Sequence, residues 1–153
     1  MKKALIMIVC ILAVHLLPIA FYSGIVITNN AIANSVEKEL KSTPLPESTV
    51  LMDSVSIAGK LVGNGNGMQY MGSILVVSRL SEEELYDYYS EAFDYVEVRK
   101  QETQKIDFIN SQDYSFELFG DPQHHDHYSV TCFKSQDTDD LAGILLNMDL
   151  RGH

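Results

Sequence analysis

Three histidines and one aspartate stand together at residues 124–127, in the stretch HHDH. Neutral imidazole is a common metal ligand, and a zinc or copper site needs three or four such donors. Adjacent side chains on a strand face opposite sides, so His125 and His127 can converge while their neighbours point away. A third ligand would have to come from Glu117 or His153. We predict an exposed polar turn here, with a metal site and a pH-responsive cluster as the alternatives.

A second unusual stretch is Gly63-Asn64-Gly65-Asn66-Gly67. A dinucleotide-binding loop requires G-x-G-x-x-G, but Met68 or Tyr70 stands where the third glycine should be, and the G-K-[ST] ending of a phosphate loop is absent. Asparagine and glycine tolerate positive φ, and the residues on both sides resemble strands. The pattern therefore predicts a hairpin turn rather than a ligand loop.

Little else in the chain suggests catalysis. Cys132, in HYSVTCFKS, is the one cysteine beyond the apolar N-terminal segment, so we expect a buried, unreactive thiol there. No nucleophile motif such as G-x-S-x-G is present. The DTDD stretch at residues 137–140 lacks the spacing of a calcium loop and predicts a solvated acidic turn. We expect no enzyme activity and no cofactor, and the sequence assigns no catalytic residue.

Residues 4–28 contain no Lys, Arg, Asp or Glu. As a helix they would reach about 37 Å, which exceeds the hydrocarbon core of a bilayer at about 30 Å. The apolar region of a cleaved signal peptide is usually shorter, so the length favours an uncleaved transmembrane anchor. The alternative is cleavage after Ala33, because Ala31 and Ala33 form an A-x-A match and Pro18 could divide the apolar run.

Charge predicts the orientation of this anchor. Lys2 and Lys3 lie next to the apolar run, whereas Lys38 and Lys41 are more distant and alternate with acidic residues, which indicates a cytoplasmic N-terminus. Of the 11 basic residues 9 follow the apolar run, together with all 21 acidic residues, a net charge of −12. Such a surface repels nucleic acid and anionic lipid headgroups and is compatible with a basic, cationic or neutral partner, although acidity of this size is more often a matter of solubility.

The chain divides into three predicted parts. Residues 1–28 hold the cytoplasmic lysine pair and the anchor, residues 29–48 form a helical stalk and a proline-containing linker, and residues 49–153 form an extracytoplasmic domain. Alternation at residues 68–76 predicts a central strand that is covered on both faces.

SEEELYDYYSEAF, residues 81–93, predicts the clearest helix of the domain. Ser81 and Glu84 can form a capping box, and Tyr88 and Tyr89 should pack on the sheet with Tyr86 at its edge. Further strands are predicted at YVEVRK, KIDFIN, YSFELF, HYSVTCF and ILLNMDL. The order indicates an α+β fold, with a mostly antiparallel sheet and one packed helix after a transmembrane helix.

The stretch STVLMDSVSIAGKLVGNGNGMQYMGSILVVSRLSEEELYDYYS, and GNGNGMQY in particular, resembles uncharacterised membrane-anchored small proteins of Gram-positive, clostridia-like bacteria. The resemblance covers about a third of the chain and implies an exported, tethered domain in such a bacterium. It implies no ligand or activity. The leading hypothesis is a membrane-tethered extracytoplasmic interaction or sensor-like module. The alternatives are a metal-binding envelope protein that uses His124, His125 and His127, and a cell-envelope hydrolase.

Overall fold

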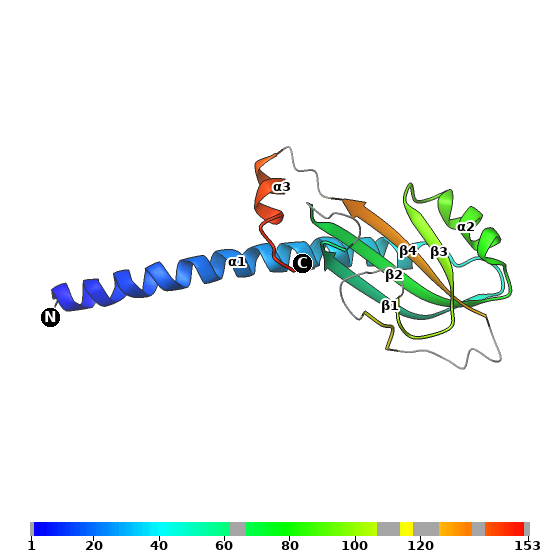
Figure 1. The fold of residues 1–153 in the computed structure, drawn as a ribbon, viewed down its shortest axis with the longest axis horizontal. Coiled ribbons are helices and arrows are strands. Elements are labelled where there is room, and N and C mark those ends of the chain that lie inside the picture. The colour runs from blue at the N-terminus through cyan, green and yellow to red at the C-terminus, as the bar shows by residue number, and fades with distance from the viewer. Residues whose placement is uncertain (1, 62–66, 107–113, 118–125, 136–139, 152–153) are drawn as a thin grey trace.

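The computed structural model describes residues 2–61, 67–106, 114–117, 126–135 and 140–151 (Figure 1). It is an α+β fold, as predicted: a long N-terminal helix, a four-stranded antiparallel sheet and a short helix packed on that sheet. The elements in chain order are α1 Lys2–Ser42, β1 Thr49–Gly59, β2 Gln69–Ser78, α2 Glu82–Ser90, β3 Val96–Gln101, β4 His127–Ser135 and α3 Leu141–Leu146.

Helix α1 is continuous over 41 residues and consists of two contrasting halves. The N-terminal half projects away from the sheet (Figure 1), and its most apolar stretch, with a mean hydropathy of 2.6, is not buried against the rest of the chain. The C-terminal half buries one stripe of side chains at helical spacing: Ile25, Asn29, Ala33, Val36 and Leu40. The segment predicted as a stalk is therefore helical, and it packs on the sheet instead of standing apart from it.

The sheet has the strand order β1-β2-β4-β3, so β2 is an inner strand. In the register, Ile74 of β2 lies opposite Ser54 of β1 and Val130 of β4. Both faces of β2 are buried: Tyr70, Ile74 and Val76 pack with α1 and α2, whereas Met71 and Leu75 pack with Ile106 and Phe116. The prediction of a central strand covered on both faces is confirmed.

Gly72 allows α1 to lie directly against β2. A Cβ atom at this position would be 2.6 Å from Cα of Glu37 and 2.8 Å from the carbonyl carbon of Val36. Ser54 on the neighbouring β1 donates a 2.6 Å hydrogen bond to the Glu37 carboxylate. The backbone of the helix thus rests on the sheet at a point where no side chain fits.

Helix α2 forms where the sequence predicts it. The Ser81 hydroxyl accepts from the backbone N–H of Glu84 at 3.2 Å, and the Glu84 carboxylate accepts from the N–H of Ser81 at 2.8 Å, which completes the capping box. Tyr89 is buried, Tyr88 is half-buried and Tyr86 is exposed, as predicted. The Tyr88 hydroxyl donates to the carbonyl of Pro44 at 2.8 Å, which ties the linker after α1 to α2.

The predicted strand at residues 144–150 is wrong, because this region forms α3 and a turn that follows it. The carboxylate of Asp140 accepts a hydrogen bond of 2.6 Å from the backbone N–H of Gly143 and thereby caps the helix. Short apolar runs do not distinguish helix from strand by periodicity, and the cap decides between them here. Ile144 and Met148 are consequently exposed rather than placed on a buried strand face.

Candidate functional site

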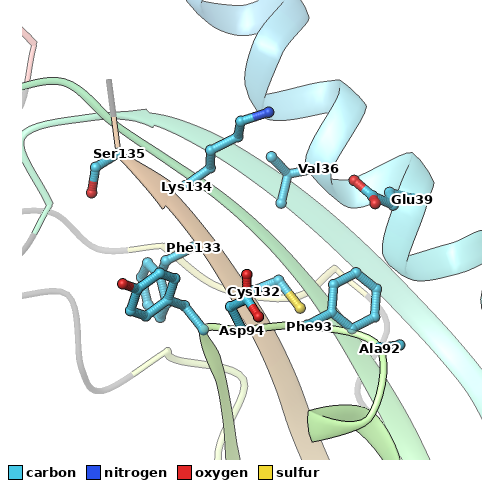
Figure 2. A pocket seen from close by; sticks show the side chains of 10 residues that line it. Val36, Glu39, Ala92, Phe93, Asp94, Cys132, Phe133, Lys134 and Ser135 are labelled. Atoms are coloured by element: carbon cyan, nitrogen blue, oxygen red, sulfur yellow. The ribbon is translucent and has the colours of Figure 1, made fainter. Parts of the chain in front are cut away.

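A cavity of about 450 Å³ opens between α1, the turn from α2 to β3, and the end of β4 (Figure 2). Val36 and Glu39 reach it from α1, and Phe93 faces them from the α2–β3 turn (Figure 2). The remaining wall is built by Cys132 and its neighbours on β4. The cavity therefore lies where the N-terminal helix meets the sheet, and it needs the packing of α1 to exist.

The wall of this cavity is apolar and its rim is charged. Val36 and Cys132 are buried in the core that α1 shares with the sheet, and Phe93 packs against that core. Glu39, Asp94 and Lys134 supply two carboxylates and one ammonium group at the opening. Tyr95, with 74% of its surface exposed, adds an aromatic ring. This combination suits a ligand that carries an apolar body and a basic group.

Cys132 is not a nucleophile in this setting. The side chain is 3% exposed. Burial, together with the nearby Glu39 carboxylate, raises the pKa of the thiol to about 12. The thiolate is the reactive form of cysteine, so the group stays protonated and inert near neutral pH. The prediction of a buried thiol is confirmed, and the raised pKa makes Cys132 a poor nucleophile near neutral pH.

The structure separates the members of the predicted histidine cluster. His127 is 2% exposed and begins β4, where it lies opposite Val77 and Gln101. The expectation of an exposed turn is therefore wrong for His127, because the residue belongs to the sheet. Asp126 is exposed, and its carboxylate forms a 2.6 Å ion pair with Lys100.

The other predicted ligands do not join His127 within the described residues. His124, His125 and His153 lie outside those residues, and Glu117 donates its backbone N–H to the Asp53 carboxylate at 2.7 Å. No group of three His, Cys, Asp or Glu side chains that could hold a metal ion occurs in the part of the chain that the structure describes. The metal site stays a prediction that this structure does not test.

The glycine and asparagine stretch connects two paired strands. Gly59 at the end of β1 lies opposite Gln69 at the start of β2, so the segment between them joins antiparallel neighbours. The turn itself lies outside the described residues, except for Gly67.

Within the acidic stretch at residues 137–140, the structure describes Asp140, which is exposed and caps α3. In the predicted strands at residues 105–110 and 114–119, Lys105 and Ser115 form an isolated antiparallel bridge.

A cluster of polar side chains is buried where α1, β2 and the C-terminal segment meet. Asn29 donates to the Asp149 carboxylate at 2.9 Å and to the carbonyl of Leu146 at 3.1 Å, and it accepts from the Tyr70 hydroxyl at 2.8 Å. Arg151 forms a 2.6 Å ion pair with Asp149. These bonds join α1 to β2 and to the C-terminal segment.

Sequence reasoning did not find the cavity. Its walls come from three segments that are distant in the sequence, and none of them carries a motif. The buried stripe on α1 stands at helical spacing in the sequence, but nothing local shows which surface it packs against. Comparison of the chain with protein-family models, with curated proteins and with solved structures gives no match.

Proposed function

We propose that the chain is a membrane-tethered extracytoplasmic interaction module. Helix α1 is its anchor, and the cavity between α1 and β4 is its binding site. The observation that carries this proposal is the division of α1 into an apolar half without burial and a half that belongs to the core of the domain. A helix that is apolar all round and unpacked is costly in water and stable in a bilayer.

The length of the exposed half supports an anchor that spans the membrane. Among the side chains that the structure describes, Ile25 is the first buried one of the helix, and the segment between Lys3 and Ile25 carries no charged residue. At 1.5 Å per residue its 21 positions, residues 4–24, reach about 31 Å, enough for a hydrocarbon core of about 30 Å. Lys2 and Lys3 at the far end favour a cytoplasmic N-terminus, which leaves the acidic sheet domain outside the cytoplasm.

The packing of α1 also argues against cleavage after Ala33. Cleavage would remove Ile25, Asn29 and Ala33, which are all buried in the folded chain. The Asp149 carboxylate would lose the Asn29 side-chain amide that donates to it, and the Tyr70 hydroxyl would lose the Asn29 oxygen that accepts from it. Buried polar groups without partners are costly, so we infer that the helix is retained as a signal anchor.

We infer that the partner at the cavity is a protein segment with an apolar side chain next to a basic one. The apolar wall would receive the first, and the carboxylates of Glu39 and Asp94 would pair with the second. The excess of acidic residues in the exported part favours a basic partner in the same way. A membrane-tethered module of this kind holds its partner close to the bilayer surface.

Location is tested by labelling intact cells with a membrane-impermeant maleimide. The parent chain carries Cys10→Ala, and a cysteine either replaces Glu83 on the exposed face of α2 or is inserted directly before Lys2, which keeps both lysines. We expect labelling at position 83 in intact cells, labelling of the N-terminal cysteine only after lysis, and recovery of the protein in the membrane fraction. Labelling of the N-terminal cysteine in intact cells would contradict the orientation, and a soluble form that begins at Asn34 would contradict the anchor.

Binding is tested by photo-crosslinking in the native membrane. A photoreactive side chain at Tyr95 on the rim is compared with one at Val50, which is exposed on the opposite edge strand β1. We expect a specific adduct from position 95 alone, and we expect Glu39→Lys to weaken it. Glu47→Lys is the matched control, because it makes the same charge change on an exposed residue away from the cavity. Equal effects of both charge reversals would contradict a role for the cavity.

A further inference from the structure

The C-terminal segment presents a row of large apolar side chains to its surroundings. Leu141, Ile144, Met148 and Leu150 are each between 51% and 72% exposed. The first three follow one another at helical spacing, because the hydrogen bond from the N–H of Met148 to the carbonyl of Leu145 continues the turn beyond α3. No charged residue occurs from Leu141 to Met148.

This segment is held at a defined position along helix α1. An apolar groove of about 420 Å³ separates the two helices and is lined by Phe21, Gly24 and Ile25 of α1 and by Ala142, Leu145 and Leu146 of α3. Hydrogen bonds fasten the segment here: Asn29 donates to the carbonyl of Leu146 at 3.1 Å and to the Asp149 carboxylate at 2.9 Å, and the N–H of Leu150 donates to the Tyr22 hydroxyl at 3.4 Å. Figure 1 shows α3 beside α1, at the end of the sheet domain that faces the N-terminal half of the helix.

The part of α1 that α3 packs beside lies at the outer boundary of the membrane when α1 spans the bilayer as proposed above. A hydrocarbon core of about 30 Å takes about 20 helical residues. Counted from the residue after Lys3, those residues end close to Tyr22, whose aromatic ring is of the kind that gathers at membrane interfaces. The groove between α1 and α3 begins at Ala20, so α3 lies at the level of the outer lipid headgroups.

We propose that α3 and the turn after it form an interfacial element that inserts into the outer leaflet of the bilayer that α1 spans. Leu141, Ile144, Met148 and Leu150 enter the boundary between headgroups and acyl chains. The charge of Asp149 does not oppose insertion, because its carboxylate is fully buried and paired with Arg151. The segment has no row of lysines or arginines, so apolar contact drives insertion and zwitterionic lipid suffices.

Such an element fixes the orientation of the domain on the membrane. One helix that crosses a bilayer leaves the attached domain able to rotate about its axis and to tilt, whereas a second point of contact removes much of that freedom. The cavity between α1 and β4 would then face a constant direction relative to the lipid surface. The inference deepens the proposed function and depends on it, because α3 meets the lipid only when α1 spans the bilayer.

The test uses the full chain in phosphatidylcholine nanodiscs, with Cys10→Ala and single cysteines that carry an environment-sensitive fluorophore. Labels at Ile144→Cys and Met148→Cys are compared with one at Ser90→Cys, an exposed position on α2. We expect lipids with a nitroxide near the headgroup to quench the labels at 144 and 148 several-fold more than the label at 90. Exchange of part of the lipid for phosphatidylglycerol should leave the quenching unchanged.

A label at Leu12→Cys, read with lipids that carry the nitroxide deep in the acyl chain, separates failure of this proposal from failure of the anchor, because position 12 lies in the middle of the apolar half of α1. Quenching at 12 without quenching at 144 and 148 would overturn the interfacial element and leave the anchor intact. Labels at 144 and 148 that are shielded from water but not quenched would mean that another protein chain covers this face, which also overturns the proposal. Quenching that requires phosphatidylglycerol would overturn the apolar mechanism. An unquenched label at 12 would contradict the anchor itself.

Discussion

The side-chain amide of Asn29 in α1 donates a 2.9 Å hydrogen bond to the carboxylate of Asp149, a residue 120 positions later in the chain. Neither side chain has exposed surface. Tyr70 on β2 donates to the same asparagine, and Arg151 pairs with the same aspartate. Helix α1, the centre of the sheet and the C-terminal segment are therefore joined through one buried polar cluster, which makes the C-terminal half of α1 part of the domain.

Replacing Asp149 with asparagine is expected to lower the free energy of unfolding of the domain by about 1.5 to 3 kcal/mol, the usual contribution of hydrogen bonds to a charged group. The measurement is urea unfolding of the detergent-solubilised chain, followed by the near-ultraviolet circular dichroism of its buried tyrosines. The matched control is Asp126→Asn, because Asp126 forms a 2.6 Å ion pair with Lys100 in which both side chains are about half exposed. Exposed pairs contribute less than about 1 kcal/mol, so equal losses in the two variants would contradict the role of the buried cluster.

The same cluster predicts a loss of stability in acid. Burial alone would raise the pKa of Asp149, but the hydrogen bonds from Arg151 and Asn29 outweigh it and hold the pKa below its usual value. A carboxylate with a lowered pKa stabilises the fold above its unfolded pKa of about 3.9, and this stabilisation is lost as the pH falls through the folded pKa. Urea unfolding at pH 7 and at pH 3 should show a smaller acid-induced loss in Asp149→Asn than in the wild type. An identical loss in both proteins would assign the acid sensitivity to other groups.

Gly72→Ala is expected to destabilise the domain by about 1 to 3 kcal/mol, the usual cost of overpacking. The added methyl group would collide with the backbone of α1 at Glu37, so the helix would have to move away from β2. The control is Gly24→Ala on α1, where a Cβ atom meets nothing within 4 Å. Alanine favours helix over glycine, so this control should cost nothing. If thermal unfolding gives Gly72→Ala the same melting temperature as the wild type, α1 does not rest on β2 at this point.

The parts of the fold that sequence reasoning recovered are those set by local chemistry. The capping box of Ser81 and Glu84 and the alternation along β2 are decided by neighbours in the chain. The packed half of α1 could not be recognised in this way. Ala33, Val36 and Leu40 stand at helical spacing, but their partner surface on β2 around Gly72 is distant in the sequence. The cavity and the polar cluster also join α1 to distant segments, so local patterns did not predict them.

Cys132 is expected to resist maleimide in the folded chain, because burial and the Glu39 carboxylate raise its pKa to about 12. In a Cys10→Ala variant, the mass of the folded protein should not change on treatment at pH 7 or at pH 9, and one adduct should form in urea. A variant with Cys10→Ala and Glu83→Cys provides the control, because position 83 is exposed on α2 and should react at once. Stoichiometric labelling of Cys132 in the folded state would contradict the closed wall of the cavity.

The histidine cluster requires a test that separates metal binding from packing. His127 is buried in β4, so its replacement by alanine is expected to destabilise the domain whether or not a metal binds. A loss of stability in the variant is therefore no evidence for a metal site. The informative quantity is the difference in melting temperature with and without zinc, measured for the wild type and for the His124→Ala, His125→Ala pair, which leaves the buried His127 in place.

We expect zinc to leave the melting temperature of both proteins unchanged and the dialysed protein to hold no stoichiometric metal. A metal that binds only the folded state at a hundred times its dissociation constant would add about 2.7 kcal/mol, an effect large enough to observe. It would weaken below about pH 6.5 as the imidazoles become protonated. A zinc-dependent rise in the wild type that disappears in the paired variant and fades on acidification would reverse the expectation. It would assign metal binding to residues 124–127, next to the start of β4.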